Sequence, residues 1–125
     1  MIDFKNKSLI KLKEINIKDG VKIVENILIE KEEVIMAFSS MRDKLVFTTK
    51  RIVSVNVQGL TGTKTDYTSI PYSKIQTYSI ETAGLLDLDA ELDLVISGLG
   101  TIRFELKGET SIRDVCRIIS EKILN

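Results

Sequence analysis

The stretch RDKLVFTTKRIVSVNVQGLTGTKTDYTSIPY, from Arg42 to Tyr72, decides how this chain folds. Apolar and polar residues alternate along it with a period of two, and the alternation is broken by a Lys-Arg pair and by a turn that contains two glycines. Alternation that is interrupted at turn residues is typical of half-buried antiparallel strands. The pattern therefore predicts a β-ribbon with strands over residues 45–48 and 52–57 and a third strand that begins at residue 67.

The same pattern continues on both sides of this ribbon. Four further strands are expected over residues 32–40, 74–80, 86–96 and 101–107. The run 86–96 is the most regular, because every second residue is apolar and most of the residues between are acidic. Seven short strands followed by a helix predict a mainly β fold, an antiparallel seven-stranded sandwich or open barrel that a C-terminal amphipathic helix closes at one end.

Two segments have the spacing of amphipathic helices. Asp19 is expected to cap a short helix, and the apolar residues after it recur at helical spacing as far as Leu28. The closing helix is expected to begin at Thr110 or Ser111. Cys116 falls on the apolar face of that helix, where a small buried side chain is a simpler interpretation than a reactive thiol.

The composition indicates one globular domain. The 125 residues are 43% hydrophobic and 29% charged, and a chain of this length buries enough surface for one core. We assign residues 1–30 to an N-terminal basic and helical extension and residues 31–125 to the main domain. The balance of 18 basic and 18 acidic side chains argues against a nucleic-acid partner. The single cysteine and the lack of an apolar leader favour a cytoplasmic protein.

The net charge of zero conceals an uneven distribution. Residues 42–74 hold six Lys or Arg against two Asp, a balance of +4, whereas residues 75–106 hold six Asp or Glu against one Arg, a balance of −5. One basic and one acidic region suit head-to-tail contacts between copies of the chain. The two regions could equally meet inside one domain as cross-strand pairs.

Several short segments occur in an order that resembles the bacterial pleckstrin-homology-like domains. They are RD, FTTKR, QGLTGTK, SIPYSKI, ETAG and DLDAEL, and the resemblance runs from about Glu32 to Leu124. It implies the pleckstrin-homology (PH) architecture, which agrees with the strand pattern. It also implies assembly into a closed homo-oligomeric ring, since single-domain members of this family form such rings, pentameric where known.

The resemblance further implies that a hydrophilic surface, where strands of adjacent copies meet, binds other proteins. We expect that interaction surface to draw on polar residues of the basic and the acidic region. The candidates are Arg42, Asp43, Lys50, Arg51, Gln58, Lys64, Glu81, Asp87, Asp89 and Glu91. The identity of the protein partner does not follow from the sequence.

Residues with catalytic potential are few. The chain has no histidine, no CxxC pair, no phosphate-binding GxxxxGK[ST] loop and no GxSxG motif, so we expect a non-catalytic protein without a cofactor. The acidic residues between 87 and 93 lie on one side of their strand. Neighbours on that side are ~6.6–6.8 Å apart, so the row cannot enclose one metal ion. A solvated face or a protein-contact face explains the row better.

An alternative function is the binding of anionic lipid or phosphate headgroups. Many PH domains bind inositol phosphates through basic residues near their first two strands, and here Arg42, Lys44, Lys50 and Arg51 occupy that region. Asp43 lies among them and opposes an anion, and phosphate recognition normally combines several charge-assisted bonds. The basic segment 1–18 could contact an anionic membrane in the same way, although packing on its own domain is favoured.

Overall fold

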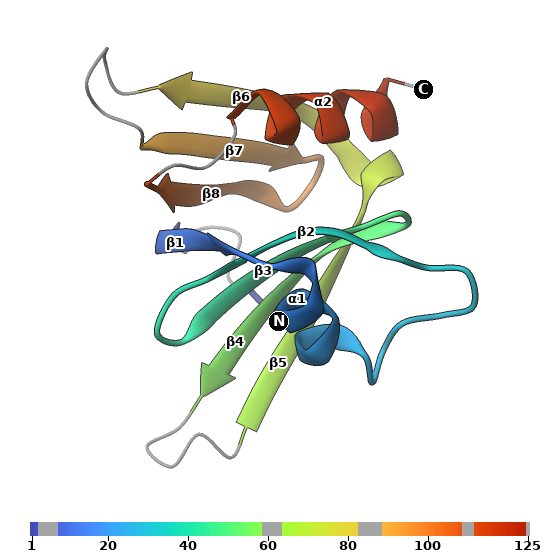
Figure 1. The fold of residues 1–125 in the computed structure, drawn as a ribbon. Coiled ribbons are helices and arrows are strands. Elements are labelled where there is room, and N and C mark those ends of the chain that lie inside the picture. The colour runs from blue at the N-terminus through green and yellow to red at the C-terminus, as the bar shows by residue number, and fades with distance from the viewer. Residues whose placement is uncertain (3–7, 59–63, 83–88, 109–111, 125) are drawn as a thin grey trace.

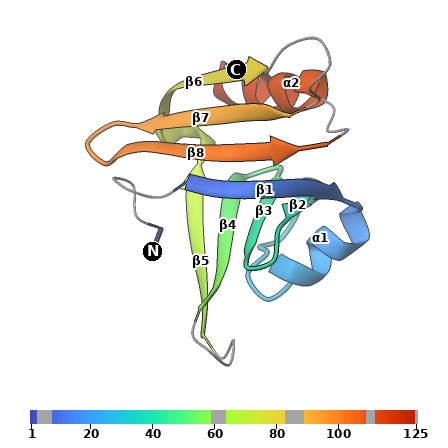
Figure 2. The ribbon, with the colours of Figure 1, turned by 90° about the vertical axis from the view of Figure 1, so that its left-hand side faces the viewer.

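The computed structural model describes residues 1–2, 8–58, 64–82, 89–108 and 112–124, and it contains one eight-stranded sheet and two α-helices. The sheet is folded over, so that β2–β5 lie across from β6–β8 (Figures 1 and 2). This confirms the predicted mainly β sandwich with a C-terminal helix. The elements are β1 (Ser8–Ile15), α1 (Ile17–Val24), β2 (Val34–Ser39), β3 (Asp43–Thr48), β4 (Arg51–Gln58), β5 (Lys64–Pro71), the 3₁₀ turn η1 (Tyr72–Lys74), β6 (Ile75–Thr82), β7 (Ala90–Ile96), β8 (Gly100–Lys107) and α2 (Ile112–Ile123).

The strand order is β5-β4-β3-β2-β1-β8-β7-β6, which makes β5 and β6 the two edges of the sheet. The main core lies between the two halves of the folded sheet. Phe38, Phe47 and Phe104 are fully buried in it, and the rings of Phe38 and Phe47 meet edge to face with centroids 6.1 Å apart. Val115 and Ile119 of α2 close this core, as the amphipathic pattern predicted.

The strand β1 is an element that the sequence pattern did not predict. It pairs antiparallel with β2 and parallel with β8, so the sheet has eight strands and is mixed rather than seven-stranded and antiparallel (Figure 2). The register shifts between Leu9 and Leu12, and Lys11 at this shift has a φ of 57°. This bulge breaks the period of two, which hides the strand in the sequence. Residues 8–15 therefore share one sheet with the rest of the chain.

The helix α1 covers the outer face of β2–β4. Its N-cap is Asn16 rather than the expected Asp19, because Asn16 Oδ1 accepts a hydrogen bond from the Asp19 backbone N–H at 2.9 Å. A Cβ atom added at Gly20 would lie 2.6 Å from Ala37 Cβ, so the helix packs very close to β2. The helix ends at Val24, and Leu28 contacts the same outer apolar cluster from the segment that follows.

A bulge also explains the ambiguous pattern of β6. Ile75 pairs with Ile96, but Thr77 pairs with Val95, so the register shifts between these pairs. This shift turns both Ile75 and Ile80 toward the main core, although they are an odd number of residues apart. The expected helix cap at residues 110–111 and the expected strand residues 86–88 lie outside the described residues.

Candidate functional site

The residues proposed for an interaction surface fall into three separate places. At one end of the β3–β4–β5 ribbon, Asp43 pairs with Asn56, Gln58 pairs with Lys64, and Arg42 lies beside them. Lys50 and Arg51 lie at the opposite end of the same ribbon. Glu81 lies on β6 and Glu91 on β7, Asp89 directly precedes β7, and Asp87 lies outside the described residues.

Arg51 belongs to a buried network at the start of β4. Its Nε donates to Glu32 Oε2 and its Nη2 donates to Glu32 Oε1, both at 2.9 Å. Arg51 also donates to the Ile27 carbonyl oxygen at 2.6 Å. The Glu32 side chain has no exposed surface, and Thr48 Oγ1 donates to it at 2.6 Å. A two-bonded guanidinium–carboxylate pair of this kind holds the 25–33 segment onto the ribbon.

The ionisation of Glu32 reflects this network. Burial would raise the pKa of its carboxyl group, but hydrogen bonds from Arg51, Thr48 and the Ile29 backbone N–H, together with the charge of Arg51, lower the pKa from 4.5 to about 2. The neighbouring Tyr72 hydroxyl donates to the Thr48 carbonyl oxygen at 2.7 Å. Burial raises the pKa of the Tyr72 hydroxyl, and the negative charge of Glu32 raises it further by a smaller amount.

The four cations considered for an anion site do not converge. Lys44 Nζ donates to the Ser40 carbonyl oxygen at 2.8 Å, and Arg42 Nη1 donates to the Val57 carbonyl oxygen at 3.4 Å. Arg51 is held by Glu32 at the far end of the ribbon, and Lys50 is exposed in the turn beside it. This arrangement provides no convergent set of donors for a phosphate group.

The outer face of β6–β8 carries a ladder of charged side chains, which we call the charge ladder. Glu81, Glu91 and Glu105 lie in register across β6, β7 and β8. Arg103 Nε and Nη2 donate to the two carboxylate oxygens of Asp93 at 2.9 and 3.0 Å, and Arg103 Nη1 lies 3.1 Å from Glu91 Oε2. The acidic side of β7 is therefore paired within the chain, with cations that come from β8 rather than from the basic region 42–74.

The second cation of the charge ladder is Lys107. Its Nζ lies 2.8 Å from Asp89 Oδ2 and 3.4 Å from Glu105 Oε1, and Asp89 Oδ1 also accepts from the Gly108 backbone N–H at 2.9 Å. The hydrogen bond to Asp89, and then that to Glu105, raise the pKa of Lys107. The hydrogen bonds to Asp93, and then the charges of Asp93 and Glu91, raise the pKa of Arg103. Every cation of the ladder is thus kept charged at neutral pH.

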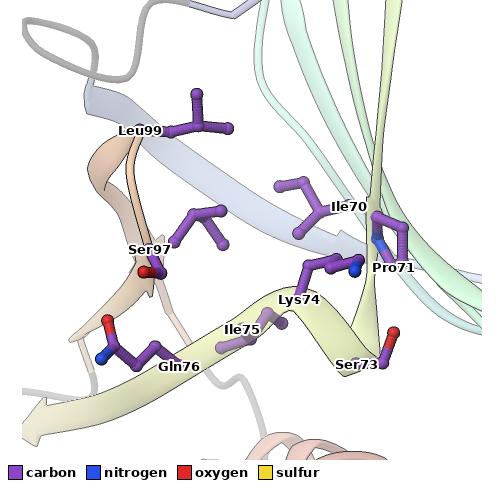
Figure 3. A pocket seen from close by; sticks show the side chains of 9 residues that line it. Ile70, Pro71, Ser73, Lys74, Ile75, Gln76, Ser97 and Leu99 are labelled. Atoms are coloured by element: carbon purple, nitrogen blue, oxygen red, sulfur yellow. The ribbon is translucent and has the colours of Figure 1, made fainter.

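A pocket of about 580 Å³ lies at the corner where the chain leaves β5, passes through η1 and enters β6 (Figure 3). Ile70, Ile75 and Ile96 form its apolar walls, and Leu99 lies across from Ile70. Lys74 extends along it toward Pro71. No pattern in the sequence indicates this pocket, because its walls come from β5, η1, β6, β7 and the β7–β8 turn.

Comparisons with known proteins identify the family. The family model described as the bacterial PH domain matches residues 3–123. The chain belongs to the bacterial PH-domain family. The uncharacterized protein YjqA of Bacillus subtilis (strain 168) is 45% identical over 97 residues, which cover 76% of this chain and 78% of YjqA. The resemblance seen in the sequence and the PH-like fold are therefore confirmed.

Solved structures of other bacterial PH-domain proteins have the same fold. A DUF1696 family protein with a PH domain from Shewanella loihica PV-4 is 35% identical, with a TM-score of 0.79 and coverage of 91% of this chain and 98% of that chain. A PH domain from Shewanella amazonensis SB2B is 38% identical, with a TM-score of 0.68 and coverage of 88% and 100%. Among the described residues of this bacterial PH domain, no helix is long and apolar enough to cross a bilayer.

Proposed function

We propose that this bacterial PH domain is a non-catalytic interaction module that assembles into a closed ring through its two edge strands. The observation that carries the proposal is the open sheet, whose edges β5 and β6 are each eight residues long and belong to the same molecule. An exposed edge presents backbone donors and acceptors to another strand. Two different edges on one copy allow each molecule to bind the next, and such head-to-tail contacts form a ring when the rotation between copies closes.

Charge favours one direction of pairing between the edges. If β5 of one copy runs antiparallel to β6 of the next, the end of β5 that carries Lys64 lies beside the end of β6 that carries Glu81. Both side chains are exposed. Opposite charges across neighbouring strands are favourable, whereas parallel pairing would place Lys64 beside Ile75. The resemblance to ring-forming members of the family suggests five copies.

This pairing also joins the separated parts of the expected interaction surface. The ribbon end with Arg42, Asp43 and Gln58 would meet the neighbour's Glu81 and Glu91 at each junction between copies. The junction would be hydrophilic and would repeat around the ring, which suits the capture of a protein partner by several weak contacts at once. Residence in the cytoplasm is part of the same proposal.

Charge reversal tests the proposal by light scattering after size exclusion. The unaltered chain should have a discrete mass that is a multiple of 14.1 kDa and that falls as salt rises. Lys64→Glu and Glu81→Lys should each lower this mass, because each places like charges at every junction. The double variant should restore it, because every junction regains an opposite pair.

Lys18 in α1 and Glu25 at the C-cap of this helix are exposed and provide matched controls. Lys18→Glu and Glu25→Lys change the net charge by the same amounts but lie away from both edges, so the mass should not change. A mass of 14.1 kDa at every salt concentration would exclude the ring. A ring that both single variants leave intact would exclude this pairing of the edges.

A further inference from the structure

The pocket beside η1, which we call the corner pocket, opens directly onto the main core. Ile70, Ile75 and Ile96 are 2%, 5% and 6% exposed and are members of the core cluster. Leu99, in the turn between β7 and β8, is 47% exposed and forms the outer wall. The volume of the corner pocket, about 580 Å³, falls within the range of small-molecule sites, roughly 300–1,000 Å³. An apolar chain placed there would extend the core and remove apolar surface from water.

The lining of the corner pocket carries a single charge. Of the residues that line it, Lys74 alone carries a charge, and Ser73, Gln76 and Ser97 are neutral. Lys74 makes no ion pair with any residue that the structure describes. Its side chain runs from η1 toward Pro71, which also lines the pocket (Figure 3). One cation beside an apolar cavity matches a ligand with one negative charge, whereas a polyphosphate headgroup would require several.

We infer that the corner pocket binds a single-chain amphiphile with one carboxylate, such as a medium-chain fatty acid. The alkyl chain lies against the three isoleucines and Leu99, and the carboxylate accepts a charge-assisted hydrogen bond from Lys74 Nζ. The site includes the Pro71 end of β5 and the Ile75 end of β6, the opposite ends of the edge strands from Lys64 and Glu81. It goes beyond the proposed assembly, and because its walls come from a single chain, its binding is tested separately from assembly.

Calorimetric titration with octanoate, decanoate and decanol, each below its micelle concentration, tests this inference. Decanoate should bind one molecule per chain. Its affinity should exceed that of octanoate by about 16-fold, because each added methylene group contributes about fourfold when it is buried. Decanol should bind about tenfold more weakly than decanoate, since it cannot form the ion pair with Lys74.

Variants and isoleucine methyl NMR locate the site. Lys74→Met should weaken decanoate about tenfold and leave decanol unchanged, whereas the exposed Lys50→Met should change neither. Leu99→Asn should weaken both ligands, and because Leu99 is exposed in a turn, this substitution leaves the core packing intact. The methyl signals of Ile70, Ile75 and Ile96 should move on addition of decanoate, and those of Ile17 and Ile29 should not.

Three results would overturn the inference: no binding of decanoate, equal loss of affinity in Lys74→Met and Lys50→Met, or methyl shifts spread over the whole chain. The last two would indicate general surfactant binding. The mass of the protein is recorded with and without decanoate. A monomer that binds decanoate as described would overturn the ring alone, and an intact ring without binding would overturn the corner-pocket inference alone.

Discussion

Two arginine–carboxylate clusters in this molecule have nearly the same bond lengths and very different surroundings. In the buried cluster, Arg51 and Glu32 meet at 2.9 Å with side chains that are 20% and 0% exposed. In the charge ladder, Arg103 and Asp93 also meet at 2.9 Å, but their side chains are 47% and 23% exposed. Distance alone therefore does not separate a pair that holds the fold from a pair that is open to a partner.

The surroundings of each pair explain the difference. The Arg51–Glu32 pair shares its donors and acceptors with Thr48 and with backbone groups of Ile27 and Ile29, so removing one partner leaves a buried charge without compensation. Water can replace either carboxylate partner of Arg103, so the loss of this ion pair lowers the free energy of unfolding only slightly. The first cluster fastens the chain between α1 and β2 to the ribbon, and the second leaves an exposed charged surface.

The largest expected effect comes from breaking the buried pair. Arg51→Met should lower the free energy of unfolding by about 3–5 kcal/mol, because Glu32 then stays buried without its cation. Urea denaturation measures this change. The double variant Glu32→Leu/Arg51→Met provides the control and should regain much of the loss, since it removes both charges. A loss below about 1 kcal/mol in Arg51→Met would show that water reaches Glu32 and would remove the contrast between the two clusters.

Acid should weaken the buried cluster in a defined range. The folded pKa of Glu32, about 2, lies below its ordinary value of 4.5, so the carboxylate stabilises the fold above 4.5 and this stability is lost as the pH falls toward 2. Near neutral pH, the free energy of unfolding of the wild type should exceed that of Glu32→Gln by about 3 kcal/mol. Urea denaturation at several pH values should show this difference shrinking from pH 4.5 downward. A difference that stays constant over that range would contradict the assigned role of Glu32.

A smaller effect is expected at the edge of the buried cluster. Tyr72→Phe removes the hydrogen bond to the Thr48 carbonyl oxygen and keeps the packing of the ring, so the free energy of unfolding should fall by about 1–3 kcal/mol. Thermal denaturation followed by circular dichroism measures it. Tyr67→Phe is a suitable control, because Tyr67 is partly exposed on the edge strand β5. Equal effects of the two substitutions would show that the network does not extend to Tyr72.

The smallest effect on stability is expected in the charge ladder. Arg103→Met should shift the urea midpoint less than Tyr72→Phe does, since exposed ion pairs contribute little and salt screens them. The shift should become smaller still at high salt, whereas that of Arg51→Met should not. If Arg103→Met destabilised the protein as much as Arg51→Met, the ladder would be part of the fold rather than a free surface.

Local pattern was sufficient for most of the strands. On β7 and β8 the alternating residues Leu92, Leu94, Ile102 and Phe104 face the core as expected, because a half-buried strand needs no more than its own period of two. The pattern failed at β1, where the bulge at Lys11 breaks the period. Sequence pattern predicts the candidate surface from residue types and not from their positions in space, so it does not indicate that Arg51 pairs with Glu32 of the same chain.

The sequence by itself determined the mainly β class, the amphipathic closing helix and the family, since these depend on short-range periodicity and on ordered local segments. The tertiary structure alone decided which charges meet. Arg51 reaches Glu32 across 19 residues, and Arg103 rather than the basic ribbon neutralises β7. The same holds for the corner pocket, whose walls come together only when β5, η1, β6, β7 and the β7–β8 turn pack. The physical reason is that partner choice depends on strand order and register, and local sequence does not encode these.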